Sequence, residues 1–263
     1  MNACFYCGVD VGSSYSKAVL LDASGGFAAG AIRRTGLDFA RVAMELHQDL
    51  LVAVPDARDN VARTVATGYG RDNVAFATSR ITEVSCQAAA CWHLFHQALT
   101  AIDVGGQDTK IIVLGETGRR TDFRMNRRCA SGTGAFLEEM AARLDTTPDG
   151  LEALAGRGRD AVPLSSFCTV FAKGELLSLI RAGRPVEDIA LGVYDAVVRR
   201  VVEMASLQSG TIVLTGGAAR PGGVLVGRFE AALGRQVLVP DRPQLTVALG
   251  AALLAMREGE GVP

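Results

Sequence analysis

The sequence predicts an α/β fold made of two similar halves, with ligands bound in the cleft between them. The first observation is a repeat: the pattern Asp-Val-Gly-x-x-x-x-Lys occurs at residues 10–17 and again at 103–110. The second observation is that each copy opens a series of short apolar strands followed by helical patterns. A repeat of this length near the start of each half indicates a duplicated domain.

The first half is predicted to occupy residues 1–98 and to begin with two strands on either side of a glycine turn. Further along, Phe39, Val42 and Leu46 have the spacing of one apolar helix face. The expected elements are strands at 5–11, 16–22, 26–33 and 61–67, helices at 37–52 and 82–94, and a turn at 68–71.

The second half is predicted to occupy residues 99–263 and to restart with the same strand and turn pattern. Residues 146–163 are rich in proline and glycine, which indicates a short helix flanked by loops and a probable insertion. The helix at 246–258 is a candidate to pack back on the first half. The expected elements are strands at 101–104, 110–114, 211–214 and 236–239, a short strand ending at 125, and helices at 134–144, 170–182, 186–206 and 246–258.

Composition excludes several classes of protein. With 49% hydrophobic and 21% charged residues the chain is globular, and its net charge of -1 favours neither nucleic acid nor an anionic membrane surface as partner. The longest nearly apolar stretch, 245–256, is too short to span a bilayer, and the N-terminus lacks the features of a signal peptide. We therefore expect a cytoplasmic protein, whose six cysteines are thiols or metal ligands and not disulfides.

The repeated turns have the chemistry of a phosphate site. Glycines that allow close backbone approach, hydroxyls, a lysine and an aspartate suit a polyphosphate with a metal ion. Asp10 and Asp103 are predicted to be catalytic and to hold Mg²⁺ through its water molecules. Gln107 or Asp108 is expected to orient the attacking water, with Gln107 as the predicted catalytic residue. Two ordinary hairpins are the alternative, and the match of Asp, Gly and Lys in both copies disfavours it.

A third glycine turn follows the predicted strand at 211–214. Gly216 and Gly217 would let an adenosine lie against the backbone, although alone they would indicate a simple strand-to-helix turn. The absence of a Gly-x-x-x-x-Gly-Lys-Ser/Thr motif disfavours a Walker-type ATPase. The residues expected to contact the nucleotide in the three turns are Gly12, Ser13, Ser14, Lys17, Gly105, Gly106, Asp108, Lys110, Gly216 and Gly217.

This triple pattern resembles the acetate and sugar kinase, heat-shock ATPase and actin superfamily. The resemblance implies two ribonuclease-H-like halves with ATP in the cleft between them. A small-molecule kinase of that superfamily, acting on a sugar or on pantothenate, is one hypothesis for the activity. A nucleotide-binding assembly subunit with vestigial turnover is another, and the retention of Asp10, Lys17, Asp103 and Gln107 weighs against it.

Two cysteines lie directly before predicted helices. Cys129 stands in Asn-Arg-Arg-Cys-Ala-Ser-Gly-Thr-Gly and Cys168 in Ser-Ser-Phe-Cys-Thr-Val-Phe-Ala. The positive end of a helix favours an anionic ligand set, and a symmetric dimer would supply the four ligands that a cubane iron–sulfur cluster usually takes. From the cysteines alone, packing as small hydrophobic residues remains the favoured interpretation.

The segments around both cysteines change that interpretation. Together with residues 10–17, 67–71, 103–110 and 243–252 they closely resemble the ATP-dependent activators of 2-hydroxyacyl-CoA dehydratases and the related ATPase subunits of benzoyl-CoA reductase. The resemblance covers essentially the whole chain. It implies an ATPase that couples ATP binding or hydrolysis to low-potential electron transfer into a partner enzyme.

The same resemblance implies the cofactors and partners. Cys129 and Cys168 of two subunits would bind one 4Fe–4S cluster per dimer, either a homodimer or a heterodimer with a related subunit. ATP or ADP would bind with Mg²⁺, and Gln244 would contact the nucleotide. The partner would be the catalytic component of a 2-hydroxyacyl-CoA dehydratase or benzoyl-CoA reductase, with a ferredoxin or flavodoxin as electron donor.

The remaining cysteines have less specific patterns. Cys4 and Cys7 form a Cys-x-x-Cys at the start of the first strand, where alternation places their side chains on opposite faces and disfavours a metal pair. Cys86 and Cys91 fall on a predicted helix and are expected to be packing residues.

Overall fold

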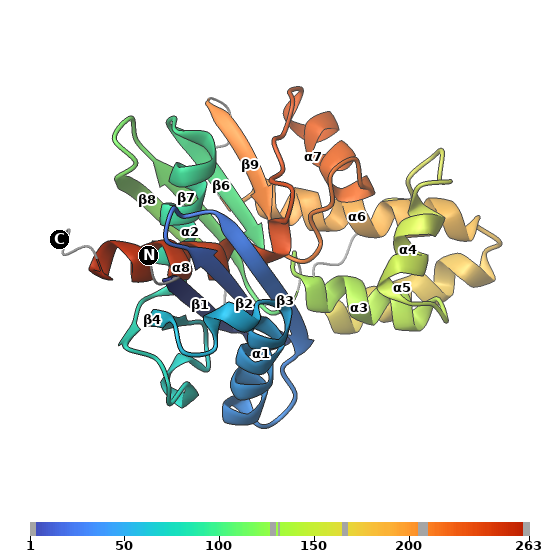
Figure 1. Ribbon diagram of the computed structural model, residues 1–263. Helices are drawn as coiled ribbons and strands as arrows, with labels where there is room; N and C mark the ends of the chain where they lie inside the picture. Colours follow the sequence, from blue (N-terminus) through green and yellow to red (C-terminus); the bar gives the residue numbers. More distant parts are fainter. Residues whose placement is uncertain (1–3, 127–129, 131, 165–167, 205–209, 260–263) are drawn as a thin grey trace. The chain divides into compact units, whose positions relative to one another are not determined.

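The computed structural model describes residues 4–126, 130, 132–164, 168–204 and 210–259 of the 263-residue chain. Its described residues divide into two compact units (Figure 1). The first unit draws on three stretches, Met1–Ala98, Leu114–Arg120 and Gln244–Pro263. The second unit draws on Leu99–Val113 and Thr121–Pro243. No helix in the described part of the chain is long and apolar enough to cross a membrane.

The first unit is built on a five-stranded sheet with the order β3-β2-β1-β4-β5. The central strand, β1, pairs antiparallel with β2 and parallel with β4. Every residue of β1 is buried, as expected for a strand whose two faces are both covered. The five strands are β1 (Phe5–Val11), β2 (Tyr15–Asp22), β3 (Phe27–Arg34), β4 (Val61–Thr67) and β5 (Ser79–Arg80).

Helices cover both faces of this sheet. On β2, Leu20 packs in the apolar cluster of helix α1 (Phe39–Ala53), whereas Val19 and Leu21 pack in the cluster of α8 (Thr246–Gly259). Since neighbouring strand residues point to opposite faces, α1 and α8 lie on opposite sides of the sheet, as Figure 1 shows. Helix α2 (Glu83–Phe95) packs beside α8.

Two glycines allow α8 to approach closely. A Cβ atom at Gly8 of β1 would lie 2.1 Å from the carbonyl oxygen of Ala248. A Cβ atom at Gly250 of α8 would lie 1.7 Å from the carbonyl oxygen of Cys86 in α2. These distances are shorter than any van der Waals contact, so only glycine fits at either position.

The second unit repeats the strand order of the first. Its four-stranded sheet has the order β8-β7-β6-β9. Counted within each unit, both sheets therefore place the third strand beside the second, the second beside the first and the first beside the fourth, as β3-β2-β1-β4 does in the first unit. Strand β6 is parallel to β9, just as β1 is parallel to β4. The common order is what a duplicated domain produces. The strands are β6 (Leu99–Val104), β7 (Thr109–Leu114), β8 (Arg120–Asn126) and β9 (Thr211–Thr215).

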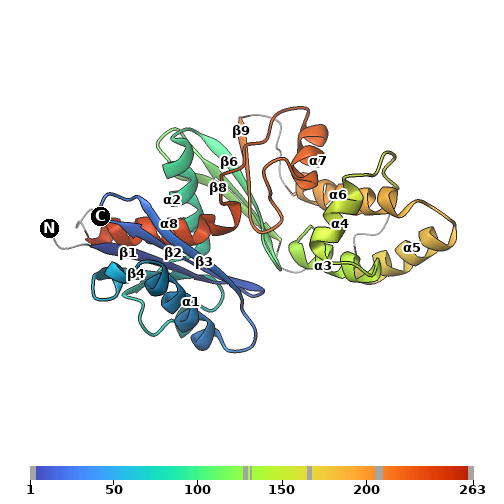
Figure 2. The same cartoon turned by 45° about the vertical axis from the view of Figure 1, so that its right-hand side comes forward.

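Five described helices gather on one side of β6 and β9 (Figure 2). Their apolar faces and Ile102, Val104 and Leu214 of the sheet form one hydrophobic cluster. Its largest fully buried side chains include Phe136 and Phe229. The helices are α3 (Gly134–Arg143), α4 (Pro148–Ala155), α5 (Thr169–Arg181), α6 (Val186–Val202) and α7 (Val224–Leu233).

The structure corrects the expectation of a strand at 236–239. Only Leu238 forms a bridge, parallel to Val213 of β9. The N–H of Val237 donates to Glu230 Oε1, and Pro240 has no N–H to extend a ladder. This segment therefore joins the sheet at one residue.

Helix α7 was not among the expected elements, and α6 ends at Val202, before the expected residue 206. The glycines at 222, 223, 227 and 234 around and within α7 indicate a loop by propensity alone. Burial of Leu225 and Phe229, four residues apart, outweighs that preference.

Candidate functional site

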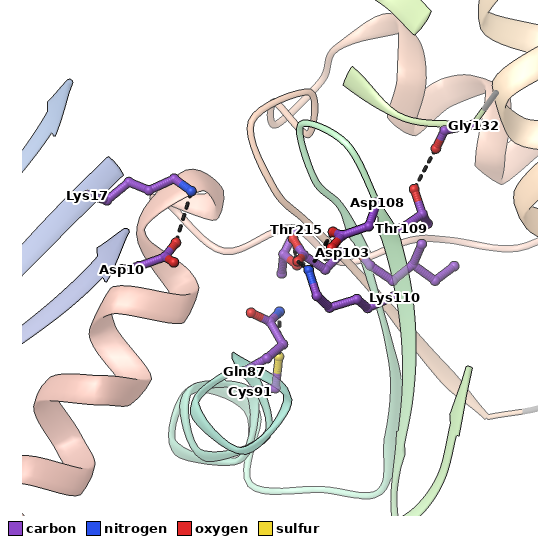
Figure 3. A network of polar contacts seen from close by, with 11 residues as sticks. Asp10, Lys17, Gln87, Cys91, Asp103, Asp108, Thr109, Lys110, Gly132 and Thr215 are labelled. Atoms are coloured by element: carbon purple, nitrogen blue, oxygen red, sulfur yellow. Dashed lines mark hydrogen bonds and ion pairs between the residues drawn. The ribbon is translucent and has the colours of Figure 1, made fainter. Parts of the chain in front are cut away.

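The first glycine turn carries a buried aspartate paired with a lysine. Asp10 of β1 lies directly opposite Lys17 of β2, and Lys17 Nζ is 2.9 Å from Asp10 Oδ2 (Figure 3). A Cβ atom at Gly12 would lie 2.6 Å from the carbonyl oxygen of Tyr15 and 3.5 Å from Lys17 Nζ. The turn is therefore closed tightly, and glycine keeps the space beside the amine open. Ser13 and Ser14 are half-buried in the same turn.

The second turn repeats this arrangement with an additional acid. Lys110 Nζ lies 3.7 Å from Asp103 Oδ2 and 2.5 Å from Asp108 Oδ1. The N–H of Gly105 donates to the carbonyl oxygen of Asp108 at 2.9 Å, which closes the turn. Gly106 is half-buried, and Gln107 is exposed.

Each aspartate also faces a threonine on the neighbouring parallel strand. Asp10 pairs in register with Thr67 of β4, and Asp103 pairs with Thr215 of β9. The Thr215 Oγ1 atom lies 3.3 Å from Asp103 Oδ1. In the sequence, residues 68–71 were predicted as a turn and residues 67–71 entered the family resemblance, but these pairings were not predicted.

A glycine with positive φ follows each of these threonines, Gly68 at +92° and Gly216 at +96°. A Cβ atom at Gly68 would lie 2.6 Å from Asp10 Oδ1, and one at Gly216 would lie 2.9 Å from Asp103 Oδ1. An apolar residue, threonine and glycine recur at the ends of β4 and β9, and this repeat could have indicated these positions from the sequence.

The third turn contains the glycines predicted to contact adenosine. The N–H of Gly216 donates to the carbonyl oxygen of Pro243 at 3.1 Å, and Gly217 is exposed. Gln244 follows Pro243 in a short 3₁₀ helix, Pro243–Leu245, and is half-buried.

Only one of the two predicted cluster ligands lies among the described residues. Cys168 is the exposed N-cap residue of α5. Cys129 lies outside the described residues. Among the residues that are described, no group of three or more His, Cys, Asp or Glu side chains is arranged to hold a metal ion.

The other cysteines pack in the core of the first unit. Cys7 belongs to the cluster around α1, whereas Cys4 packs with Tyr6 and Cys86 on the opposite side of the sheet, as strand alternation predicts. Burial raises the pKa of Cys7 and of Cys86 to about 12. Cys91 is also buried, and Gln87 Nε2 lies 3.6 Å from its sulfur.

The duplicated sheet order is that of the actin-like ATPase and sugar kinase fold, an α/β fold of two similar units. The chain belongs to the BadF/BadG/BcrA/BcrD ATPase family, which matches residues 7–255.

Relatives of the chain are named as dehydratase activators or as part of a reductase. It is 40% identical over 251 residues to the activator of lactoyl-CoA dehydratase from Anaerotignum propionicum, covering 94% of this chain and 96% of that protein. It is 35% identical over 254 residues to the (R)-2-hydroxyglutaryl-CoA dehydratase activating ATPase from Acidaminococcus fermentans, covering 95% and 96%. A subunit of benzoyl-CoA reductase from Thauera aromatica is 26% identical over 258 residues, covering 94% and 91%.

Solved structures agree with the predicted fold class. The activator of the 2-hydroxyisocaproyl-CoA dehydratase from Clostridium difficile with bound ADPNP has a TM-score of 0.90 at 35% identity, covering 98% of this chain and 96% of that one. A ROK family glucokinase from Streptomyces griseus has a TM-score of 0.57 at 14% identity, covering 96% and 99%. The second likeness shows the fold alone.

Proposed function

We propose that this protein is a cytoplasmic ATPase that couples ATP binding and hydrolysis to the transfer of a low-potential electron into a 2-hydroxyacyl-CoA dehydratase or benzoyl-CoA reductase. Membership of the ATPase family and the names of its relatives support this proposal. The working form would be a homodimer or a heterodimer with a related subunit. A ferredoxin or flavodoxin would supply the electron.

The residues of the two repeated turns fit Mg-ATP. Lys17 has its amine beside the open space that Gly12 leaves, where it would contact a phosphate. Asp10 and Asp103 are buried carboxylates at strand ends, suited to hold the waters of Mg²⁺. Exposed Gln107 would orient the attacking water. That one nucleotide contacts both turns stays a prediction of the sequence repeat.

The observation that carries the electron-transfer part is the exposure of Cys168 at the N-terminus of α5. The other described cysteines are buried or half-buried in the core. An exposed thiol at the positive end of a 13-residue helix fits an anionic ligand set that a second subunit completes. When bound, a 4Fe–4S cluster would supply one-electron chemistry at a low potential.

Iron and acid-labile sulfide per subunit, after strictly anaerobic purification, test this proposal. We expect about two irons per subunit in the wild type, since one four-iron cluster would be shared by two subunits. Cys129→Ala and Cys168→Ala should each lose the iron, whereas Cys4→Ser is a matched control at a half-buried position and should retain it.

The opposite outcome is equally specific. A protein that stays free of iron after anaerobic reconstitution, yet binds ATP, would contradict the electron-transfer function. Phosphorylation of an added sugar or of pantothenate by such a protein would then favour a small-molecule kinase.

A further inference from the structure

The first turn of helix α3 is bonded to the second glycine turn. The N–H of Gly134 donates to the carbonyl oxygen of Gly105 at 2.8 Å, and the N–H of Ala135 donates to that of Gly106 at 2.7 Å. The first N–H groups of a helix have no partner inside the helix. Here two of them are satisfied by the backbone of the predicted phosphate-binding turn, so α3 begins on that turn.

A third hydrogen bond reinforces the attachment from a side chain. Thr109 follows the turn in β7, is fully buried, and donates from Oγ1 to the carbonyl oxygen of Gly132 at 2.5 Å (Figure 3). Gly132 is itself buried and has a φ of +83°. In the sequence it stands three residues after Cys129.

A threonine hydroxyl also bonds to the first glycine turn, but it ties that turn to a different element. Thr35 is also buried and donates from Oγ1 to the carbonyl oxygen of Gly12 at 2.7 Å. Thr35 directly follows β3, so this bond fixes the first turn to the edge of its own sheet. The second turn is instead fixed to the start of a helix.

We propose that Thr109 is a positioning residue which, with the N–H groups of Gly134 and Ala135, makes the second turn and the start of α3 one rigid body. A displacement of the turn on nucleotide binding would then move Gly132 and the first turn of α3, which follow Cys129 in the sequence. The inference rests on the proposed function for its nucleotide. Breaking a buried hydrogen bond without a new partner is costly, and close-packed elements transmit displacement.

Thermodynamic linkage makes the connection between the second turn and the start of α3 act in both directions. If nucleotide binding changes the conformational equilibrium of this segment, a ligand on the segment changes nucleotide affinity by the same factor. The effect of the nucleotide on the segment and the effect of the segment's ligand on nucleotide affinity both depend on the same three hydrogen bonds.

Two pairs of variants isolate these bonds. Thr109→Val removes the hydroxyl at nearly constant shape, and Thr109→Ser restores it. Gly134 is the first residue of α3, where proline is well tolerated, and Thr133 before it is already extended at φ −125° and ψ 168°. Gly134→Pro replaces the N–H by a ring carbon that faces the Gly105 oxygen and so forces this contact apart, while Gly134→Ala retains the N–H and adds the same Cβ, 3.2 Å from that oxygen.

The measurement is amide hydrogen exchange of the peptide covering residues 127–137, with and without ADPNP and Mg²⁺, on the anaerobically purified full-length protein. In the wild type we expect the nucleotide to change this exchange. At saturating ADPNP, Thr109→Val and Gly134→Pro should reduce that response by about fivefold or more, and Thr109→Ser and Gly134→Ala should preserve most of it. Thr35→Val should weaken ADPNP binding yet respond fully when saturated.

A full exchange response in both Thr109→Val and Gly134→Pro, or no response in the wild type despite bound ADPNP, would overturn the inference. The readout needs no iron, so failure of the cluster proposal would appear separately as an iron-free protein that still responds. If one variant of a pair unfolds, the other pair tests the same connection.

Discussion

Thr215 Oγ1 contacts one oxygen of the Asp103 carboxylate, and Lys110 Nζ lies beside the other. The hydroxyl is 3.3 Å from Oδ1 and the amine is 3.7 Å from Oδ2. The two contacts come from opposite sides, since β9 and β7 flank β6 in the sheet. The orientation of this carboxylate is therefore fixed before any ligand binds.

Thr215→Val should lower the kcat of ATP hydrolysis about tenfold, with a smaller change in KM, because the carboxylate would lose one of the groups that orient it. Steady-state kinetics at saturating Mg²⁺ would check this. Thr215→Ser keeps the hydroxyl and should stay within about threefold of wild type. A wild-type kcat in Thr215→Val would show that the hydroxyl does not orient the Asp103 carboxylate.

Gly216→Ala should destabilise the protein more than Gly222→Ala. Both glycines have positive φ, at +96° and +71°, which costs an alanine about 1–2 kcal/mol. A Cβ at Gly216 would also lie 2.2 Å from the Val104 oxygen, which adds about 1–3 kcal/mol, whereas one at Gly222 meets nothing within 4 Å. Urea unfolding measures the difference, and equal midpoints would contradict the close approach.

The cysteines should differ sharply in reactivity. Burial raises the pKa of Cys7 and of Cys86 to about 12, so at pH 8 roughly one in 10⁴ of these thiols is ionised. Cys168 is exposed. In folded protein freed of iron, iodoacetamide followed by peptide mass spectrometry should label Cys168 first, and label Cys7 and Cys86 only after denaturant is added. Early labelling of Cys7 would show that β1 opens readily.

Acidification should destabilise the fold partly through His47. Burial lowers the pKa of this imidazole, whose ring packs on Phe76 with centroids 4.6 Å apart. The unfolded chain therefore binds the proton more readily. The stability that the neutral ring contributes is present above pH 6.5 and is lost as pH falls from that value through the lower pKa of the folded state.

His47→Phe keeps the ring contact without titration, so its free energy of unfolding should fall less between about pH 7.5 and 5.5 than that of wild type. Burial also lowers the pKa of His93, which should leave a residual slope in this variant. An unchanged slope in His47→Phe would assign the whole effect to other groups.

Local sequence patterns predicted much of the fold. The repeated strands on both sides of Gly12 and Gly105 were confirmed, because apolar runs and glycine turns are short-range signals. The prediction of a strand at 236–239 was wrong, because the N–H of Val237 donates to the side chain of Glu230 in α7 and not to the sheet. Helix α7 was missed because its stability comes from the packing of Leu225 and Phe229, which propensity does not include.

The contacts within each turn are local, whereas the contacts between parallel strands are not. Asp10 and Lys17 lie in one hairpin, so their pairing depends only on the local register of two strands joined by a short turn. The pairings of Asp10 with Thr67 and of Asp103 with Thr215 depend on the register of parallel strands far apart in the sequence. No short-range pattern contains that register, which the crossover connections and core packing set.

Helix α8 covers one face of the first sheet, yet the ribosome makes it only after the whole second unit. Until residue 246 is synthesised, Val19 and Leu21 of β2 lack the helix against which they pack. The second unit has all its own strands and helices by residue 243. The order in which the two units complete their cores is therefore the reverse of the order in which they begin.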